Sequence, residues 1–130
     1  MKFALIGATL PALDYHSNAQ RTSELRNLLI NKGLTFVGVQ NISSNITSQL
    51  FLVESTDESQ VILMAQIFGQ KAILVSDEHK NMEVVSTRSN GRTALGKLGP
   101  VSKDDAAKAK FCITFNESGK SYYYVTKKGA

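Results

Sequence analysis

The chain has 130 residues, 42% of them hydrophobic and 20% charged, which predicts one folded, soluble domain and excludes a disordered protein. Its apolar runs are too short to span a membrane, and a single cysteine excludes an intramolecular disulfide, so a reducing compartment is expected. Residues 1–87 carry six Lys/Arg and eight Asp/Glu (net −2), whereas residues 88–130 carry nine and three (net +6). The basic residues of the tail are spread thinly, which favours a solvated surface over a nucleic-acid site.

The first part of the chain is expected to form an apolar strand, a polar loop and an amphipathic helix. Phe3–Ala8 is an apolar run without helical spacing, and residues 9–17 follow it as a loop. Ser17 and Gln20 have the spacing of a capping box, which predicts a helix that ends at Gly33. A polar loop beside a helix amino terminus can hold an anionic group such as a carboxylate, although an ordinary connection has the same pattern.

Four further strands are predicted from alternating or apolar runs, and they cover residues 34–40, 50–53, 71–76 and 82–85. Residues 41–48 have the composition of an exposed loop. Residues 55–58 form a second capping box, which opens a helix that continues to Phe68 with Gly69 as its stop. The first four strands and the two helices therefore follow the order βαββαβ, which is typical of a ferredoxin-like α+β fold, and residues 82–85 are a weaker fifth strand. In that fold two helices cover one face of an antiparallel sheet, and the other face needs a different cover.

The second helix is more apolar than one buried stripe requires. Its core face and its other faces both carry apolar residues: Val61, Met64, Ala65 and Phe68 on the first, and Ile62, Leu63 and Ile67 on the others. Excess apolar surface on a helix predicts a second packing partner. Together with the uncovered face of the sheet, this helix predicts self-association.

The last third of the chain is expected to contain a long connection and a hairpin. Residues 88–109 are predicted to form an extended loop with a helical turn at 104–108, and residues 110–126 a C-terminal β-hairpin. Residues 1–87 then form the core of a single domain that covers residues 1–130. Three adjacent tyrosines in the hairpin, Tyr122–Tyr124, are suited to stacking on bases, but packed rings with wet hydroxyls have the same pattern.

The chain lacks the residues that most catalytic mechanisms use. His16 and His79 have no partner at metal-ligand spacing, so no metal site is expected. Cys112 lies among apolar residues of a predicted strand, which favours a structural thiol. Neither a phosphate-binding glycine loop nor a nucleophile elbow is present. An enzyme with this inventory is expected to catalyse a reaction that depends on placement more than on proton transfer.

Several segments, in order along the chain, resemble one enzyme family. They are Asn18-Ala19-Gln20-Arg21 with Leu25-Arg26, Val53-Glu54-Ser55, the strand around Val75, and Cys112-Ile113-Thr114-Phe115-Asn116-Glu117-Ser118-Gly119-Lys120. Together they resemble the phage-encoded S-adenosylmethionine-degrading enzymes, once called hydrolases and now understood as lyases. Asn18-x-x-Arg21 and Gly69-Gln70-Lys71-Ala72 also resemble an uncharacterised bacterial domain family.

The resemblance implies a PII-like sandwich that assembles as a homotrimer, with active sites at the subunit interfaces. It implies a unimolecular reaction in which the carboxylate of S-adenosylmethionine attacks its own γ-carbon, expels methylthioadenosine and leaves homoserine lactone. No base, cofactor or metal is needed, and a dry site that folds the methionine chain favours the loss of charge. The expected setting is the host cytoplasm, where this reaction counteracts restriction and modification, and no membrane partner is expected.

The resemblance also implies which residues form the site. Thr9, Leu10, Pro11 and Tyr15 are expected to line the adenosine pocket, with Asn18 and Arg21 at the start of the helix. Family members use a carboxylate near the start of the third strand, where this chain has Ser48-Gln49. Three residues are therefore the candidates for the catalytic contact with the ammonium or sulfonium group: Gln49, Glu54 and Glu83. The two acids also fit exposed strand-end positions, and Arg21 also fits an ion pair with Glu24.

Two other functions remain open at the level of the sequence. One is a non-catalytic PII-like module that binds a nucleotide or a protein partner without destroying it. The other is a nucleic-acid-binding accessory protein that uses the basic tail of residues 88–130, whose binding would fall steeply with salt.

Overall fold

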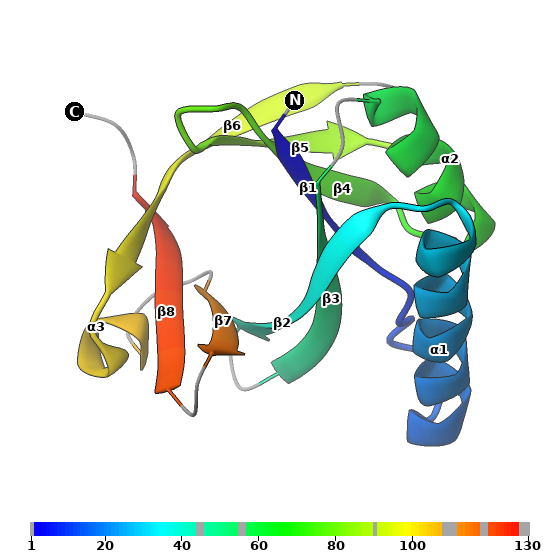
Figure 1. Cartoon of the computed structure of the whole chain (residues 1–130), viewed down its shortest axis with the longest axis horizontal. Helices are drawn as coiled ribbons and strands as arrows, with labels where there is room; N and C mark the ends of the chain where they lie inside the picture. The colour runs from blue at the N-terminus through cyan, green and yellow to red at the C-terminus, as the bar shows by residue number, and fades with distance from the viewer. Residues whose placement is uncertain are drawn as a thin grey trace.

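A computed structural model of the chain describes residues 2–43, 46–54, 57–89, 91–107, 112–117 and 120–127. Within these ranges the chain forms eight strands and three helices, shown in Figure 1. In chain order they are β1 (Phe3–Gly7), α1 (Tyr15–Asn31), β2 (Thr35–Ser43), β3 (Ile46–Glu54), α2 (Glu58–Ile67), β4 (Ala72–Ser76), β5 (Asn81–Ser86), β6 (Arg92–Val101), α3 (Lys103–Ala107), β7 (Cys112–Glu117) and β8 (Lys120–Lys127). None of the described helices is long and apolar enough to cross a membrane.

The eight strands form one closed antiparallel barrel in the order β1-β3-β2-β7-β8-β6-β5-β4. The barrel closes where β4 pairs with β1, with Ala4 opposite Val75. The prediction of a ferredoxin-like or PII-like α+β sandwich is therefore wrong, whereas the predicted antiparallel pair of C-terminal strands is present as β7 and β8. The β7–β8 pair exists, but β7 pairs with β2 and β8 with β6, so these strands complete the sheet instead of standing apart from it.

The interior of the barrel is an apolar core to which every strand contributes at least one side chain. Its buried members are Leu5, Val39, Met82, Leu98 and Ile113, and Phe3, Leu50, Leu52, Leu74, Leu95 and Tyr124 pack against them. The face of the sheet that was expected to need a cover from another subunit is thus covered by the curvature of the sheet itself.

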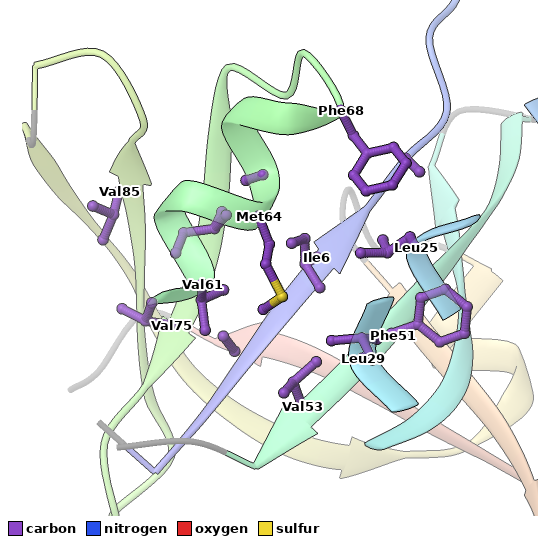
Figure 2. Packing of buried hydrophobic residues seen from close by; sticks show 14 residues of the cluster. Ile6, Leu25, Leu29, Phe51, Val53, Val61, Met64, Phe68, Val75 and Val85 are labelled. Atoms are coloured by element: carbon purple, nitrogen blue, oxygen red, sulfur yellow. The ribbon is translucent and has the colours of Figure 1, made fainter. Parts of the chain in front are cut away.

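A second core lies outside the barrel, where α1 and α2 both pack on the same side of the sheet (Figure 1). Figure 2 shows Met64 of α2 and Leu29 of α1 pointing toward Ile6 and Val53 of the wall. The predicted core face of α2 is confirmed, because Val61, Met64, Ala65 and Phe68 are all buried. Helix α3 covers a third, smaller cluster of Ala106, Cys112 and Val125 on the other side of the barrel.

The ends of the two long helices follow local rules. Asp14 caps α1 by accepting a hydrogen bond from the Ser17 amide at 2.7 Å, so the predicted start at Ser17 is wrong by three residues. Asp57 caps α2 in the same way. The two predicted glycine stops are confirmed, since Gly33 and Gly69 both have φ of 68°, which is costly for other residues.

Two predicted loops are strands in the structure. Residues 92–101 form β6 instead of part of an extended loop, although this strand contains Gly96, Gly99 and Pro100. Gly96 has φ of 118° beside a register shift in the β5–β6 pair, which is a β-bulge. The predicted loop at 41–48 is also wrong for its described part, because β2 continues to Ser43 and β3 begins at Ile46. Residues 44 and 45 lie outside the described residues.

Candidate functional site

The loop between β1 and α1 is folded around the amide of Asn18. Its Oδ1 accepts from the Leu10 amide at 2.9 Å, and its Nδ2 donates to the carbonyl oxygens of Leu10 and Leu13 at 3.1 and 3.3 Å. Both ends of the side-chain amide are therefore used within the loop. Asn18, predicted to bind substrate, fixes the shape of the loop that carries Thr9, Leu10 and Pro11.

Arg21 joins this loop to the end of α2. Its Nε donates to the carbonyl oxygen of Ala8 at 2.7 Å, its Nη2 donates to that of Phe68, and its guanidinium lies 5.7 Å from the centre of the Phe68 ring. These contacts are with backbone carbonyls, not with Glu24, whose carboxylate instead accepts from Gln20 at 3.3 Å.

Gln70 also holds this loop. Its Nε2 donates to the carbonyl oxygens of Thr9 at 3.0 Å and Phe68 at 3.2 Å. Arg21 and Gln70 thus hold consecutive carbonyls, those of Ala8 and Thr9, at the point where the chain leaves β1. Gln70 is not among the predicted site residues. Its signals in the sequence are its position directly after the Gly69 stop and its place in Gly69-Gln70-Lys71-Ala72, which resembles an uncharacterised bacterial domain family.

Among the three predicted catalytic residues, only Gln49 lies at this end of the barrel. Leu50 pairs with Gly7, and the carbonyl oxygen of Gln49 lies 3.5 Å from the position that a Cβ on Gly7 would occupy. The Gln49 amide donates to the carbonyl oxygens of Val39 and Leu50 at 3.2 and 3.0 Å. The Gln49 amide lies over Gly38, because a Cβ added to Gly38 would lie 2.9 Å from the Gln49 Nε2.

The two predicted acids lie elsewhere. Glu54 is exposed and pairs with Phe3 at the far end of β1, roughly 13 Å from Gly7 at the usual rise of a strand. Glu83 is half-buried on β5 and binds Arg92, with Nη2 to Oε1 at 3.2 Å. The same guanidinium binds Glu58 at 2.6 Å, and hydrogen bonds from Glu83 and then Glu58 raise the pKa of Arg92. Glu83 therefore lies in an ion-pair cluster separate from the loop.

The remaining predicted residues differ in exposure. Thr9 and Leu10 are half-buried, whereas Pro11 is exposed. Tyr15 is 83% exposed, and its ring meets only the His16 ring, edge to face at 5.8 Å, among the ring contacts of the described residues. Pro11 and Tyr15 are thus both exposed on the outside of the loop and of the helix start.

An open polar pocket of about 350 Å³ adjoins the loop, a volume near the lower end for small-molecule sites. It is lined by Gln66, Gly69, Gln70, Thr87 and Arg88. Gly69 connects it to the loop, because an added Cβ there would lie 3.9 Å from both Arg21 and Leu10. Arg88 is the cationic member of the lining. Sequence reasoning missed this lining because Arg88 begins the stretch predicted to be a loop and Thr87 directly precedes it.

Among the described residues there is no group of three or more His, Cys, Asp and Glu side chains arranged to hold a metal ion. The site at the carboxyl end of β1 is therefore made of side-chain amides, backbone carbonyls and the part-buried guanidinium of Arg21. Such groups can hold a polar ligand in a fixed pose, which is what catalysis by placement requires.

Comparison with known proteins identifies the chain. The sequence model of one protein family, described as the S-Adenosylmethionine lyase family, matches residues 4–126. This range includes every residue of the loop, of α2 and of the pocket. No curated protein matches the chain.

Proposed function

This chain belongs to the S-adenosylmethionine lyase family, and from that premise we propose that it converts S-adenosylmethionine to 5′-methylthioadenosine and L-homoserine lactone. The observation that carries the proposal is the family match over residues 4–126. The expectation from the sequence alone, that a chain with so few nucleophiles and bases depends on placement, points to the same kind of reaction.

The proposed reaction needs no atom from the protein or from water. A carboxylate oxygen of the substrate forms a bond to its own γ-carbon, the bond between that carbon and sulfur breaks, and its electron pair neutralises the sulfonium. One anion and one cation disappear together, so a site that excludes water and holds the methionine chain folded favours the transition state. The reaction then requires neither a base nor a metal ion.

We assign the substrate to the end of the barrel where the β1–α1 loop lies. Thr9, Leu10, Pro11 and Tyr15 contact the adenosine part, while Asn18 and Arg21 contribute by fixing the loop through their hydrogen bonds. Gln49 is the candidate for contact with the polar end of the substrate, because it lies at the same end of the barrel as the loop and in the same copy of the chain. Glu54 and Glu83 reach this site only if a second copy of the chain supplies them.

The biological setting belongs to the same proposal. Destruction of S-adenosylmethionine in the cytoplasm of an infected host would remove the cofactor of its restriction and modification enzymes. A phage origin, this anti-restriction role and a homotrimeric assembly all follow from the family resemblance described above. Each is open to its own test.

The reaction is tested with purified protein and S-adenosylmethionine in buffer that contains a chelator and is made with ¹⁸O-labelled water. We expect 5′-methylthioadenosine by chromatography, with unlabelled homoserine lactone as the first partner product. Later opening of the lactone by water labels the carboxyl group of homoserine, whereas hydrolysis at the γ-carbon labels its hydroxyl. Label in the hydroxyl overturns the lyase mechanism, and loss of turnover with the chelator overturns metal independence.

A matched control separates catalysis from contamination. The chain with Gln49→Ala is purified in the same way and is expected to show a raised KM for S-adenosylmethionine, because its amide is removed from the assigned site. Saturable binding of S-adenosylmethionine by calorimetry without product formation would replace the lyase by a binding module.

A further inference from the structure

Gln70 is the residue at which three segments of the chain meet. Its amide donates to the carbonyl oxygen of Ala65 at 2.9 Å, and its own carbonyl oxygen accepts from the Thr87 hydroxyl at 2.7 Å. Its side chain donates to Thr9 and Phe68. Residues of α2, of the β1–α1 loop and of the segment after β5 are therefore joined through one glutamine.

The main chain of Gln70 is held rigidly because its partner Thr87 is itself fixed. Thr87 is 3% exposed, its amide donates to the carbonyl oxygen of Lys71 at 3.0 Å, and its carbonyl oxygen accepts from Gln66 at 2.6 Å. Thr87 thus anchors both neighbouring residues of the chain at the entry to β4. A side chain that starts from such an anchored position reaches its acceptors with little loss of conformational entropy.

Where the loop leaves β1, two side-chain hydrogen bonds hold its backbone carbonyls. The carbonyl of Ala8 is held by Arg21 and that of Thr9 by Gln70. These two bonds set the direction in which the loop leaves β1. Pro11 lies beyond them and is exposed.

We propose that Gln70 is a positioning residue of the S-adenosylmethionine site: its Nε2 fixes the Thr9 carbonyl and so presents residues 9–15 to the substrate. The inference rests on the proposed function, since it takes the loop as the surface that binds adenosine. Gln70 acts through the loop and touches no reacting atom. Adenosine contacts are equally strong in the ground state and the transition state, so their loss raises KM and leaves kcat nearly unchanged.

The first test replaces the amide by a group whose donor depends on pH. In Gln70→Glu the ionised carboxylate cannot donate to the Thr9 carbonyl, and we expect KM to rise about tenfold at pH 8 with kcat within about twofold of the unsubstituted enzyme. Two carbonyl oxygens face this position, which favours the protonated acid as the pH falls toward its usual pKa. The protonated acid donates one hydrogen bond, so the ratio of the two KM values should fall at least about threefold between pH 8 and pH 5.

Two further variants separate positioning from general damage. Gln70→Met has similar length and no donor, so it should raise KM by a similar factor with no recovery at low pH. Gln60→Glu makes the same change of charge at the opposite end of α2, and its KM should equal that of the unsubstituted enzyme at both pH values. Thermal unfolding by circular dichroism shows whether each variant is folded at the assay temperature.

The outcomes are distinct. If unsubstituted enzyme does not convert S-adenosylmethionine, the proposed function fails and this inference fails with it. If it does, and Gln70→Glu keeps the unsubstituted KM or lowers kcat alone, the positioning role is overturned while the function stands. A raised KM that is the same at pH 8 and pH 5 for the glutamate variant also overturns the role, because the hydrogen bond would then not be its cause.

Discussion

Arg21 is bound to Phe68 in two ways at once, since its guanidinium donates to the Phe68 carbonyl oxygen and lies 5.7 Å from the centre of the Phe68 ring. The two residues are 47 positions apart, one on α1 and one at the end of α2. A third contact, to Ala8, includes β1 in the same junction. The planar fork of arginine allows these contacts together, which a lysine ammonium cannot reproduce.

Arg21→Lys should therefore destabilise the protein although it keeps the charge. We expect the free energy of unfolding in urea to fall by about 2 kcal/mol, the usual cost of losing hydrogen bonds to a charged, partly buried donor. Arg26→Lys changes an exposed arginine of the same helix, and it should lower the free energy of unfolding by less than about 0.5 kcal/mol. Equal losses for the two variants would show that the junction contributes nothing specific.

The turn between β4 and β5 stores strain at Lys80. Its φ is 65°, and it is the only non-glycine residue with a positive φ among those that the structure describes. Glycine adopts this conformation without steric cost. Lys80→Gly should raise the free energy of unfolding by about 0.5–1 kcal/mol, measured by urea denaturation. Lys97→Gly, made in the exposed part of β6, should lower it, because there glycine only adds freedom to the unfolded chain.

Asp77 gives the same turn a dependence on pH. Its carboxylate accepts from the side chain and amide of Asn81 and from the amide of His79, and the Asn81 side chain is the largest cause of its lowered pKa. A carboxyl group whose pKa is lower in the folded state stabilises the fold above its unfolded pKa of about 3.9 and loses this contribution as the pH falls through the folded value.

The urea midpoint of Asp77→Asn should therefore lie below that of the unsubstituted protein at pH 7, and the difference should shrink at pH 3. Glu78→Gln, at the exposed neighbouring position, is the control and should show no such convergence. A difference that stays constant from pH 7 to pH 3 would mean that the titration of Asp77 is not coupled to folding.

The thiol of Cys112 is expected to be inert in the native protein. Cys112 is 2% exposed in the cluster under α3, and burial raises the pKa of its thiol. Since thiolate is the reactive form, alkylation by iodoacetamide at pH 8 should be at least about a hundredfold slower in the native protein than in urea. Mass spectrometry of the intact chain measures both rates. Rapid native labelling would contradict the structural role that the sequence predicts for this residue.

Local signals in the sequence were sufficient for much of the fold. The glycine stops of the two long helices and the core face of α2 follow from local spacing and from the chemistry of Gly33 and Gly69. The start of α2 was placed two residues early, because the capping box of residues 55–58 begins at Ser55 whereas Asp57 is the cap. The start of α1 was missed because Ser17 and Gln20 imitate a capping box, while the true cap is Asp14. Closure of the barrel was missed because it depends on pairings such as Pro100 with Tyr124, between residues far apart in sequence, and because glycine and proline in β6 resemble a loop.

The site shows a similar division. The loop from Thr9 and the helix start at Asn18 and Arg21 were selected from the sequence, and the structure brings them together. Gln70 and Thr87 were missed because no local pattern reports a hydrogen bond between residues 61 or 17 positions apart. Glu83 was selected for its charge, which Arg92 and Glu58 already engage in the fold.

Assembly gives the last prediction. Self-association was expected from an uncovered sheet face and from excess apolar surface on α2, but the barrel interior removes the first reason. The second remains, because Leu63 and Ile67, one turn apart on α2, are 61% and 68% exposed. If copies of the chain associate through this helix, the double variant Leu63→Asp with Ile67→Asp should dissociate a trimer to monomers in light scattering coupled to size exclusion. Ile30→Asp, at a 50% exposed position of α1, should leave the trimer intact. A monomeric unsubstituted protein would overturn the trimer, and a trimer that survives the double variant would assign its interface to another surface.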